Sequence, residues 1–267
     1  MTAKNKSALT EKDGVSQPET TSKSSAEKIK QRRSKQVSTN EFVTNILAGN
    51  IPFLSRAITL IESTSNKHFE FGQRVLENVL EKTGNSLRIG ITGPPGVGKS
   101  TLIDILGLYY CNNNYKTAVL AVDPSSKLSG GSILGDKTRM TELAKHQNSY
   151  IRPTPSSGML GGTASRTKET ILLCEAAGFD TIFIETVGVG QSEIAVHSMV
   201  DCFLLLMLPG AGDELQGIKR GIMEMAHIVA INKAENEKDA IANKAVQNYK
   251  NALHLLPAES SGWITQV

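Results

Sequence analysis

Residues 87–101 read LRIGITGPPGVGKST, and this stretch decides the fold. Its first six residues alternate and are rich in β-branched side chains, as in a buried strand, and the pattern after Ser100 is helical. Between these elements, Gly93, Gly98, Lys99 and Ser100 complete the pattern G-x-x-x-x-G-K-[ST], which is typical of a phosphate loop. A glycine-rich turn that binds nothing is the alternative. The motif is favoured because strand, loop and helix all occur where it requires them.

The chemistry of a phosphate loop gives its residues roles. Backbone N–H groups and the positive end of the following helix dipole bind phosphate oxygens. We expect Lys99 to reach the β- and γ-phosphates and the Ser100 hydroxyl to coordinate Mg²⁺. The predicted nucleotide contacts in the loop are Gly93, Pro94, Pro95, Gly96, Val97, Gly98, Lys99, Ser100 and Thr101.

The composition is that of an ordinary globular protein. The 267 residues are 39% hydrophobic and 21% charged, which predicts one sizeable core. The longest apolar run, residues 202–208, has the length of a strand, so we expect no membrane span. Cys111, Cys174 and Cys202 show no pairing or metal-binding pattern, which favours reduced, buried cysteines in a cytoplasmic protein.

Positive charge is concentrated in residues 1–40. This segment has nine Lys or Arg and four Asp or Glu, a net charge of +5, whereas the rest of the chain has a net charge of −2. Because it has few large apolar groups, we predict a disordered basic tail; binding of residues 28–35 to an acidic partner is the alternative. Its acidic residues argue against a mitochondrial leader. The negative remainder argues against nucleic-acid binding.

Residues 41–84 show a helical pattern, in which apolar residues recur at intervals of three and four. The apolar stripes are Phe42, Ile46 and Leu47, then Leu54, Ala57, Ile58 and Ile61, then Phe71, Val75, Leu76, Val79 and Leu80. Turn residues at 49–52 and 63–66 separate three helices. We predict a helical extension that packs on the nucleotide-binding domain and has a structural or partner-facing role.

Strands and helices alternate after the phosphate loop. The further predicted strands are 117–122, 149–152, 181–185, 202–208 and 227–231. This alternation predicts an α/β fold over residues 85–267, with a mostly parallel sheet, helices on both faces and ligands at the carboxyl ends of the strands. With the phosphate loop, it predicts the fold of a P-loop NTPase.

Three carboxylates lie at predicted strand ends or in a glycine-rich loop. Asp123 follows the second strand, Asp136 lies in GGSILGDKTRM, and Glu185 ends the strand IFIE. Together with Ser100 they offer the oxygen ligands that Mg²⁺ prefers, either directly or through water. Each acid alone also fits a cap or a turn, and that alternative stays open for Asp123, which precedes a proline.

Glu185 and Gly188 form the pattern E-x-x-G, a relative of the D-x-x-G sequence whose backbone N–H senses the γ-phosphate. The next residue, often the glutamine that orients the attacking water, is Val189. Gln191 or Glu193 would reach the water only if the loop bends toward it. We therefore predict slow intrinsic hydrolysis that a partner accelerates.

A cation beside the reacting phosphate would stabilise the transition state. Lys137 and Arg139 are the candidates because they lie beside Asp136 in the same loop. The predicted catalytic residues are Lys99, Glu185, Gly188, Arg139 and Gln191.

The sequence IVAINKAEN indicates which base is bound. Asn232 and Lys233 follow a buried strand, and Glu235 stands where the guanine-reading sequence N-K-x-D has aspartate. A carboxylate there accepts hydrogen bonds from guanine N1–H and the exocyclic amine, for which adenine has no matching donors. We predict GTP and GDP as ligands; the longer side chain of Glu235 keeps adenine as the alternative.

The motifs GPPGVGKST, AVDPSS, GSILGDKTRM, IRPTPSSGMLGG, ETVGVGQSE, LMLPGAGDELQGIKRGIMEM and INKA together closely resemble those of the MeaB/ArgK-type GTPases. These are bacterial relatives of the human methylmalonic aciduria type A protein. The resemblance covers roughly Phe42 to Trp263. It implies a GTPase chaperone of methylmalonyl-CoA mutase or a related adenosylcobalamin-dependent mutase, in which GTP gates cofactor delivery and protects the mutase. By motif, it places the Mg²⁺ and switch residues at Ser100, Asp123, Asp136 and Glu185.

The sequence departs from this family's pattern in two places. One is Glu235. The other is Val267, the last residue, beyond which relatives have a further strand, a base-contacting S-A loop and a helical arm used for homodimerisation. We therefore expect weaker guanine binding and no arm-mediated homodimer from these 267 residues.

Other classes of function stay open at this point. An ATP-using kinase of a transport system is the older description of such proteins, but no acceptor or base motif stands out. A nickel-delivery GTPase would have a His- or Cys-rich tract, whereas the five histidines here are scattered. The last alternative is a shortened interaction module without nucleotide binding.

Overall fold

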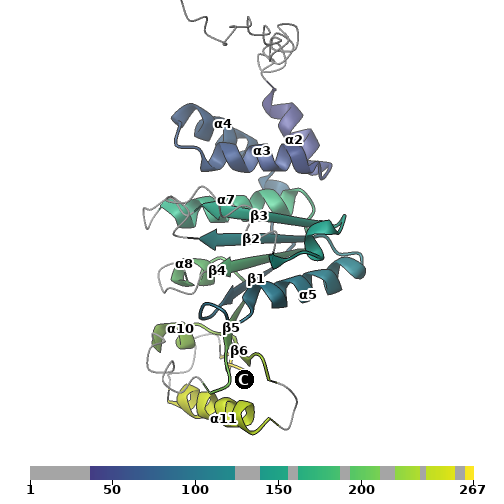
Figure 1. The fold of residues 1–267 in the computed structure, drawn as a ribbon. Helices are drawn as coiled ribbons and strands as arrows, with labels where there is room; N and C mark the ends of the chain where they lie inside the picture. The colour runs from purple at the N-terminus through teal and green to yellow at the C-terminus, as the bar shows by residue number, and fades with distance from the viewer. Residues whose placement is uncertain are drawn as a thin grey trace, which may run out of the picture. The chain divides into compact units, whose positions relative to one another are not determined.

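Six parallel strands form the sheet (Figure 1). The computed structural model describes residues 37–123, 139–155, 162–186, 193–210, 220–234, 239–255 and 262–267. The strands are β1 (Leu87–Thr92), β2 (Thr117–Asp123), β3 (Ser149–Pro155), β4 (Thr181–Thr186), β5 (Cys202–Met207) and β6 (Ile228–Ile231). They lie in the order β3-β2-β4-β1-β5-β6 and every neighbouring pair is parallel. The predicted strands and the parallel α/β sheet are confirmed.

Helices precede the sheet and connect its strands. The α-helices are α2 (Thr39–Leu47), α3 (Ile51–Glu62), α4 (Asn66–Glu77), α5 (Lys99–Asn112), α7 (Gly162–Ala176), α8 (Glu193–His197), α10 (Arg220–Glu224) and α11 (Ala240–His254). Two 3-10 helices are η1 (Leu80–Lys82) and η2 (Leu143–Lys145). Among the residues that the structure describes, no helix has the length and apolar character needed to cross a membrane.

Helices cover both faces of the sheet, as two neighbouring residues of β1 show. Gly90 faces α8, because a Cβ there would lie 3.2 Å from Val196 Cγ1. Ile91 is fully buried in the same apolar cluster as Ile103 of α5. Since successive strand residues point to opposite faces, α8 and α5 lie on opposite sides of β1. The phosphate-loop helix therefore packs on the face opposite to α8.

Helices α2, α3 and α4 pack on one another through their predicted apolar stripes. The Phe42 ring makes edge-to-face contacts with Phe53 and Phe71, at centroid distances of 5.3 and 5.5 Å. The prediction is wrong for Leu47 and Leu80, which are 42% and 43% exposed. Leu47 is the last residue of α2, and Leu80 lies beyond the end of α4, as the first residue of η1. Both side chains thus lie where their predicted stripes leave the packed α-helices.

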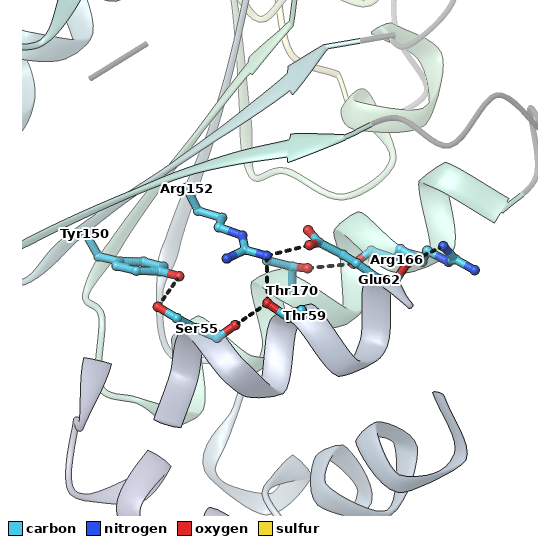
Figure 2. Close-up of polar contacts among 7 residues, drawn as sticks. All are labelled: Ser55, Thr59, Glu62, Tyr150, Arg152, Arg166 and Thr170. Atoms are coloured by element: carbon cyan, nitrogen blue, oxygen red, sulfur yellow. Dashed lines mark hydrogen bonds and ion pairs between the residues drawn. The ribbon is translucent and has the colours of Figure 1, made fainter. Parts of the chain in front are cut away.

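A polar cluster attaches α3 to β3 and α7 (Figure 2). The Arg152 guanidinium of β3 contacts Glu62 Oε2 at 2.5 Å, and the Tyr150 hydroxyl lies 3.1 Å from Ser55 Oγ. Arg166 of α7 donates to the backbone carbonyl of Glu62 at 2.8 Å. The carboxyl end of α3 is thus bonded both to the edge strand of the sheet and to the helix that follows it.

The three cysteines are free thiols. Cys111 and Cys174 are buried as predicted. Cys202 is half-buried, because it is the first residue of β5 and lies at the end of that strand. Burial raises the pKa of each thiol, which disfavours the reactive thiolate.

Candidate nucleotide-binding site

The predicted phosphate loop connects the carboxyl end of β1 to α5 (Figure 1). Gly98 is the residue that precedes the first turn of α5, and it has no side chain with which to cap the helix. The first amide groups of α5 therefore retain the capacity to bind an anion, which the positive end of the helix dipole also favours. This part of the chain has the geometry that a phosphate site needs.

Two glycines of the loop have no room for a side chain. Gly93 has a φ of +145°, and a Cβ there would lie 2.3 Å from the carbonyl oxygen of Leu206. At Gly98, with a φ of +103°, a Cβ would lie 2.6 Å from Asn232 Nδ2. Both positions thus require glycine for backbone conformation and for close packing.

Lys99 begins α5 and is only 7% exposed. Its ammonium group folds back on the loop and donates to the carbonyl oxygens of Gly93 at 2.7 Å and Pro94 at 3.1 Å. Burial lowers the pKa of Lys99, and the negative charges of Glu185 and Glu193 oppose this effect. A buried cation beside carbonyl groups is suited to bind phosphate oxygens instead.

The predicted magnesium residues Ser100 and Glu185 are in contact. Ser100 Oγ donates to Glu185 Oε1 at 2.9 Å, a pairing of oxygen ligands that fits Mg²⁺. Asp123 ends the neighbouring strand two residues beyond Ala121, the partner of Glu185 in the sheet; for Asp123 only the backbone is described. Within the described ranges no three acidic, histidine or cysteine residues group as a metal site, so the magnesium assignment stays a prediction.

A buried pair of hydroxyl groups joins β1 and β4 at the residues that follow Ile91 and Glu185. Thr186 Oγ1 donates to Thr92 Oγ1 at 2.8 Å, and both residues are 1% exposed. Thr92 directly precedes Gly93 of the phosphate loop, and Thr186 directly follows Glu185. This bond therefore connects the strand that supports the loop to the strand that delivers the carboxylate.

Asn232 and Lys233 are hydrogen-bonded to the same loop. Asn232 Nδ2 donates to the Val97 carbonyl and Lys233 Nζ to the Gly96 carbonyl, each at 2.8 Å. Lys233 has a φ of +60°, a left-handed conformation that is uncommon for a residue other than glycine. The first two residues of the predicted base-reading sequence, Asn232 and Lys233, are thus held against the phosphate loop.

Not all predicted residues are described. Asp136, Gly188, Gln191 and Glu235 lie outside the described residues.

Arg139 is exposed, and its charge contributes to lowering the pKa of Lys99. Glu193 begins α8 and is 1% exposed. Its negative charge, like that of Glu185, opposes the lowering of the Lys99 pKa by burial.

The chain matches the family model described as "Methylmalonyl Co-A mutase-associated GTPase MeaB" over residues 54–267. The chain belongs to the MeaB family. The match includes the phosphate loop, Glu185 and the sequence that begins at Asn232. The family resemblance predicted from the motifs is confirmed.

Curated relatives agree with the MeaB assignment. The chain is 54% identical over 220 residues to a probable GTPase of Mycobacterium tuberculosis, covering 82% of this chain and 66% of that protein. It is 46% identical over 227 residues to the GTPase ArgK of Escherichia coli, covering 85% of this chain and 69% of ArgK. The chain thus spans about two thirds of the length of these relatives.

A solved structure is similar in fold and sequence. The crystal structure of an LAO/AO transport system kinase superposes with a TM-score of 0.71 and 35% identity, covering 87% of this chain and 70% of that one. Together with the sheet order, it supports the P-loop NTPase architecture of this MeaB-family chain.

Sequence reasoning missed two contributions to the site of this MeaB-family chain. The Thr92–Thr186 bond joins residues of two different strands, and only the position of Thr186 beside Glu185 hinted at it. Asp104 is the one acidic residue of α5, within KSTLIDILGLYYCN, and accepts a hydrogen bond from the backbone N–H of Leu143. An isolated carboxylate in an apolar helix was the available signal.

Proposed function

We propose that this chain binds GTP with Mg²⁺ and hydrolyses it to GDP and phosphate. The observation that carries the proposal is the pair of bonds from Asn232 and Lys233 to the carbonyls of Val97 and Gly96. These bonds hold the base-reading sequence beside the phosphate loop, so one nucleotide would reach both. Glu235 would accept from guanine N1–H and the exocyclic amine, donors that adenine lacks on that edge.

The residues at the phosphate end have complementary tasks. Lys99 would leave the carbonyls of its loop and donate to the β- and γ-phosphate oxygens. The Ser100 hydroxyl and the Glu185 carboxylate would hold Mg²⁺, which neutralises charge on these oxygens when bound. Water would attack the γ-phosphorus as the bond between this phosphorus and the β–γ bridging oxygen breaks, so that GDP leaves and a proton of the water passes to the released phosphate. Arg139 would stabilise the negative charge that grows on the bridging oxygen. Gly188 and Gln191 are proposed to sense the γ-phosphate and orient the water.

We propose further that this GTPase is a chaperone of an adenosylcobalamin-dependent mutase of the methylmalonyl-CoA mutase type. The description of its family as mutase-associated supports this partner. Val189 supports regulation by a partner, because valine cannot orient the water as glutamine does. GTP binding and hydrolysis would gate delivery of the cofactor and protect the mutase.

An ATP-using transport kinase is the second candidate. Glu235 in place of aspartate favours it, because the added methylene alters the fit to guanine. The similarity to the crystal structure of an LAO/AO transport system kinase points the same way.

Nucleotide competition and phosphate release test the proposal. Labelled GTP bound to the whole chain with Mg²⁺ should resist excess ATP, and Lys99→Ala should abolish tight binding. Phosphate release from GTP should be well below about 10 s⁻¹ and should rise when the mutase is added. Equal competition by ATP would refute the guanine assignment, and unchanged release with the mutase would refute the partner.

A further inference from the structure

Residues 139–145 contribute to the core of the domain. Met140 and Leu143 in this segment are fully buried. Both belong to the apolar cluster that contains Ile103 of α5 and Phe183 of β4. The segment is therefore part of the core packing around the phosphate-loop helix.

Asp104 adds a polar anchor to this packing. Its Oδ1 accepts a hydrogen bond of 2.8 Å from the backbone N–H of Leu143, the first residue of η2. The first amides of a helix have no partner within the helix, so a carboxylate that accepts one stabilises the helix start. Asp104 lies in α5, five positions after Lys99.

Gly107 brings Leu143 close to the backbone of α5. A Cβ at Gly107 would lie 2.5 Å from Leu143 Cδ2 and 3.0 Å from Leu143 Cδ1. Gly107 lies three positions after Asp104, and residues at this spacing share one side of a helix. One side of α5 thus holds Leu143 by its backbone amide and by its side chain.

The anchored segment begins with Arg139, which directly precedes Met140. In the proposed function, Arg139 is the cation that stabilises the charge growing on the β–γ bridging oxygen. Helix α5 therefore carries Lys99 in its first turn and, through Leu143, fixes the chain next to Arg139.

We propose that Asp104 is a positioning residue for GTP hydrolysis, which sets the place of Arg139 relative to Lys99 by holding Leu143 on α5. The inference rests on the proposed function, since Arg139 has transition-state charge to neutralise only if the nucleotide is hydrolysed. A small displacement of such a group slows a reaction strongly: about 1 Å corresponds to roughly 100-fold.

The test compares Asp104→Ala, Asp104→Asn, Arg139→Ala and the double variant Asp104→Ala/Arg139→Ala in the whole chain. We measure single-turnover phosphate release, GDP affinity and melting temperature. Asp104→Ala should slow release by roughly 10- to 100-fold and leave GDP affinity within about twofold. Asp104→Asn should retain the rate of the wild type, because its amide oxygen accepts the same N–H. The double variant should be no slower than Arg139→Ala.

Two further variants distinguish a loss of positioning from a folding defect of Asp104→Ala. Gly107→Ala displaces Leu143 while alanine favours the helix, and it should slow release without loss of GDP affinity. Glu142→Gln is the matched control, because Glu142 precedes Leu143 but its side chain is 61% exposed and pairs with Lys145; its rate should equal that of the wild type.

The outcomes separate the inference from the proposed function. The positioning role alone would be overturned if the double variant lost rate by the product of the two single losses. It would also be overturned if Asp104→Ala released phosphate as fast as a wild type that hydrolyses GTP. Parallel losses of rate and GDP affinity would also overturn it, because they indicate a general structural role. No hydrolysis by the wild type, with or without the mutase, would overturn both.

Discussion

Ser100 Oγ donates a hydrogen bond of 2.9 Å to Glu185 Oε1 and so joins the first turn of α5 to the end of β4. If this pair holds Mg²⁺, Glu185→Gln retains the shape of the side chain and removes the charge that attracts the ion. We expect the Mg²⁺ concentration needed for tight GTP binding to rise and hydrolysis to fall by roughly 100-fold. Nucleotide binding and phosphate release, titrated with Mg²⁺, measure both effects.

The matched control for this variant is Glu81→Gln in η1, an exposed glutamate of the helical extension. Its Mg²⁺ dependence should equal that of the wild type. A Glu185→Gln protein with an unchanged Mg²⁺ dependence would show that Glu185 has no part in holding the ion.

The Thr186–Thr92 bond predicts a coupled effect on stability. Thr186→Val retains the volume of the side chain and leaves the buried Thr92 hydroxyl without this partner. We expect the free energy of unfolding to fall by about 1–3 kcal/mol, measured by chemical denaturation. The double variant Thr92→Val/Thr186→Val should be less destabilised than the sum of the two single variants; strict additivity would mean that the two hydroxyls do not interact.

The sequence was sufficient to predict the elements because the fold has strong local signals. Each buried parallel strand is a short apolar run next to turn residues, as in Thr181–Thr186. The phosphate loop has fixed spacing, and its structure explains that spacing: Gly93 and Gly98 are surrounded so closely that no Cβ fits. Helix ends were less predictable, as the exposure of Leu47 and Leu80 shows.

Contacts between distant residues could not be predicted in this way. The bond between Thr92 and Thr186 spans 94 positions, and that between Asp104 and Leu143 spans 39. Both depend on which strands and helices become neighbours, which periodicity does not determine. Ser100 and Glu185, which the motifs assign to a common Mg²⁺, do lie in contact; the ion itself stays a prediction.

Substitutions at Gly93 and Gly84 separate the cost of an unfavourable backbone conformation from the cost of close packing. Both have positive φ values, +145° and +91°, but only Gly93 has close neighbours, whereas nothing lies within 4 Å of a Cβ at Gly84. Gly93→Ala should lower the free energy of unfolding by about 1–3 kcal/mol and abolish GTP binding, because the Leu206 carbonyl must move. Gly84→Ala should retain binding and lose only the conformational part, up to about 1 kcal/mol. Equal losses in thermal unfolding would contradict a packing role for Gly93.

The Glu62–Arg152 contact predicts how the stability of the protein depends on pH (Figure 2). Burial raises the pKa of Glu62 above its ordinary value of 4.5, and the attraction of Arg152 opposes this only in part. The folded protein therefore holds this proton more tightly than the unfolded chain. Between 4.5 and the raised pKa, the contribution of Glu62 to the free energy of unfolding falls as pH rises.

Glu62→Gln removes this titration, so the unfolding free energy of the wild type minus that of Glu62→Gln should decline as pH rises through this window and then become constant. When both proteins of this pair also carry Arg152→Met, the same difference should decline by a larger amount, because Arg152→Met removes the attraction that partly offsets burial. Urea denaturation at a series of pH values measures the difference for each pair. A difference that increases with pH would show instead that the ion pair outweighs the desolvation of Glu62 at the junction of α3 and β3.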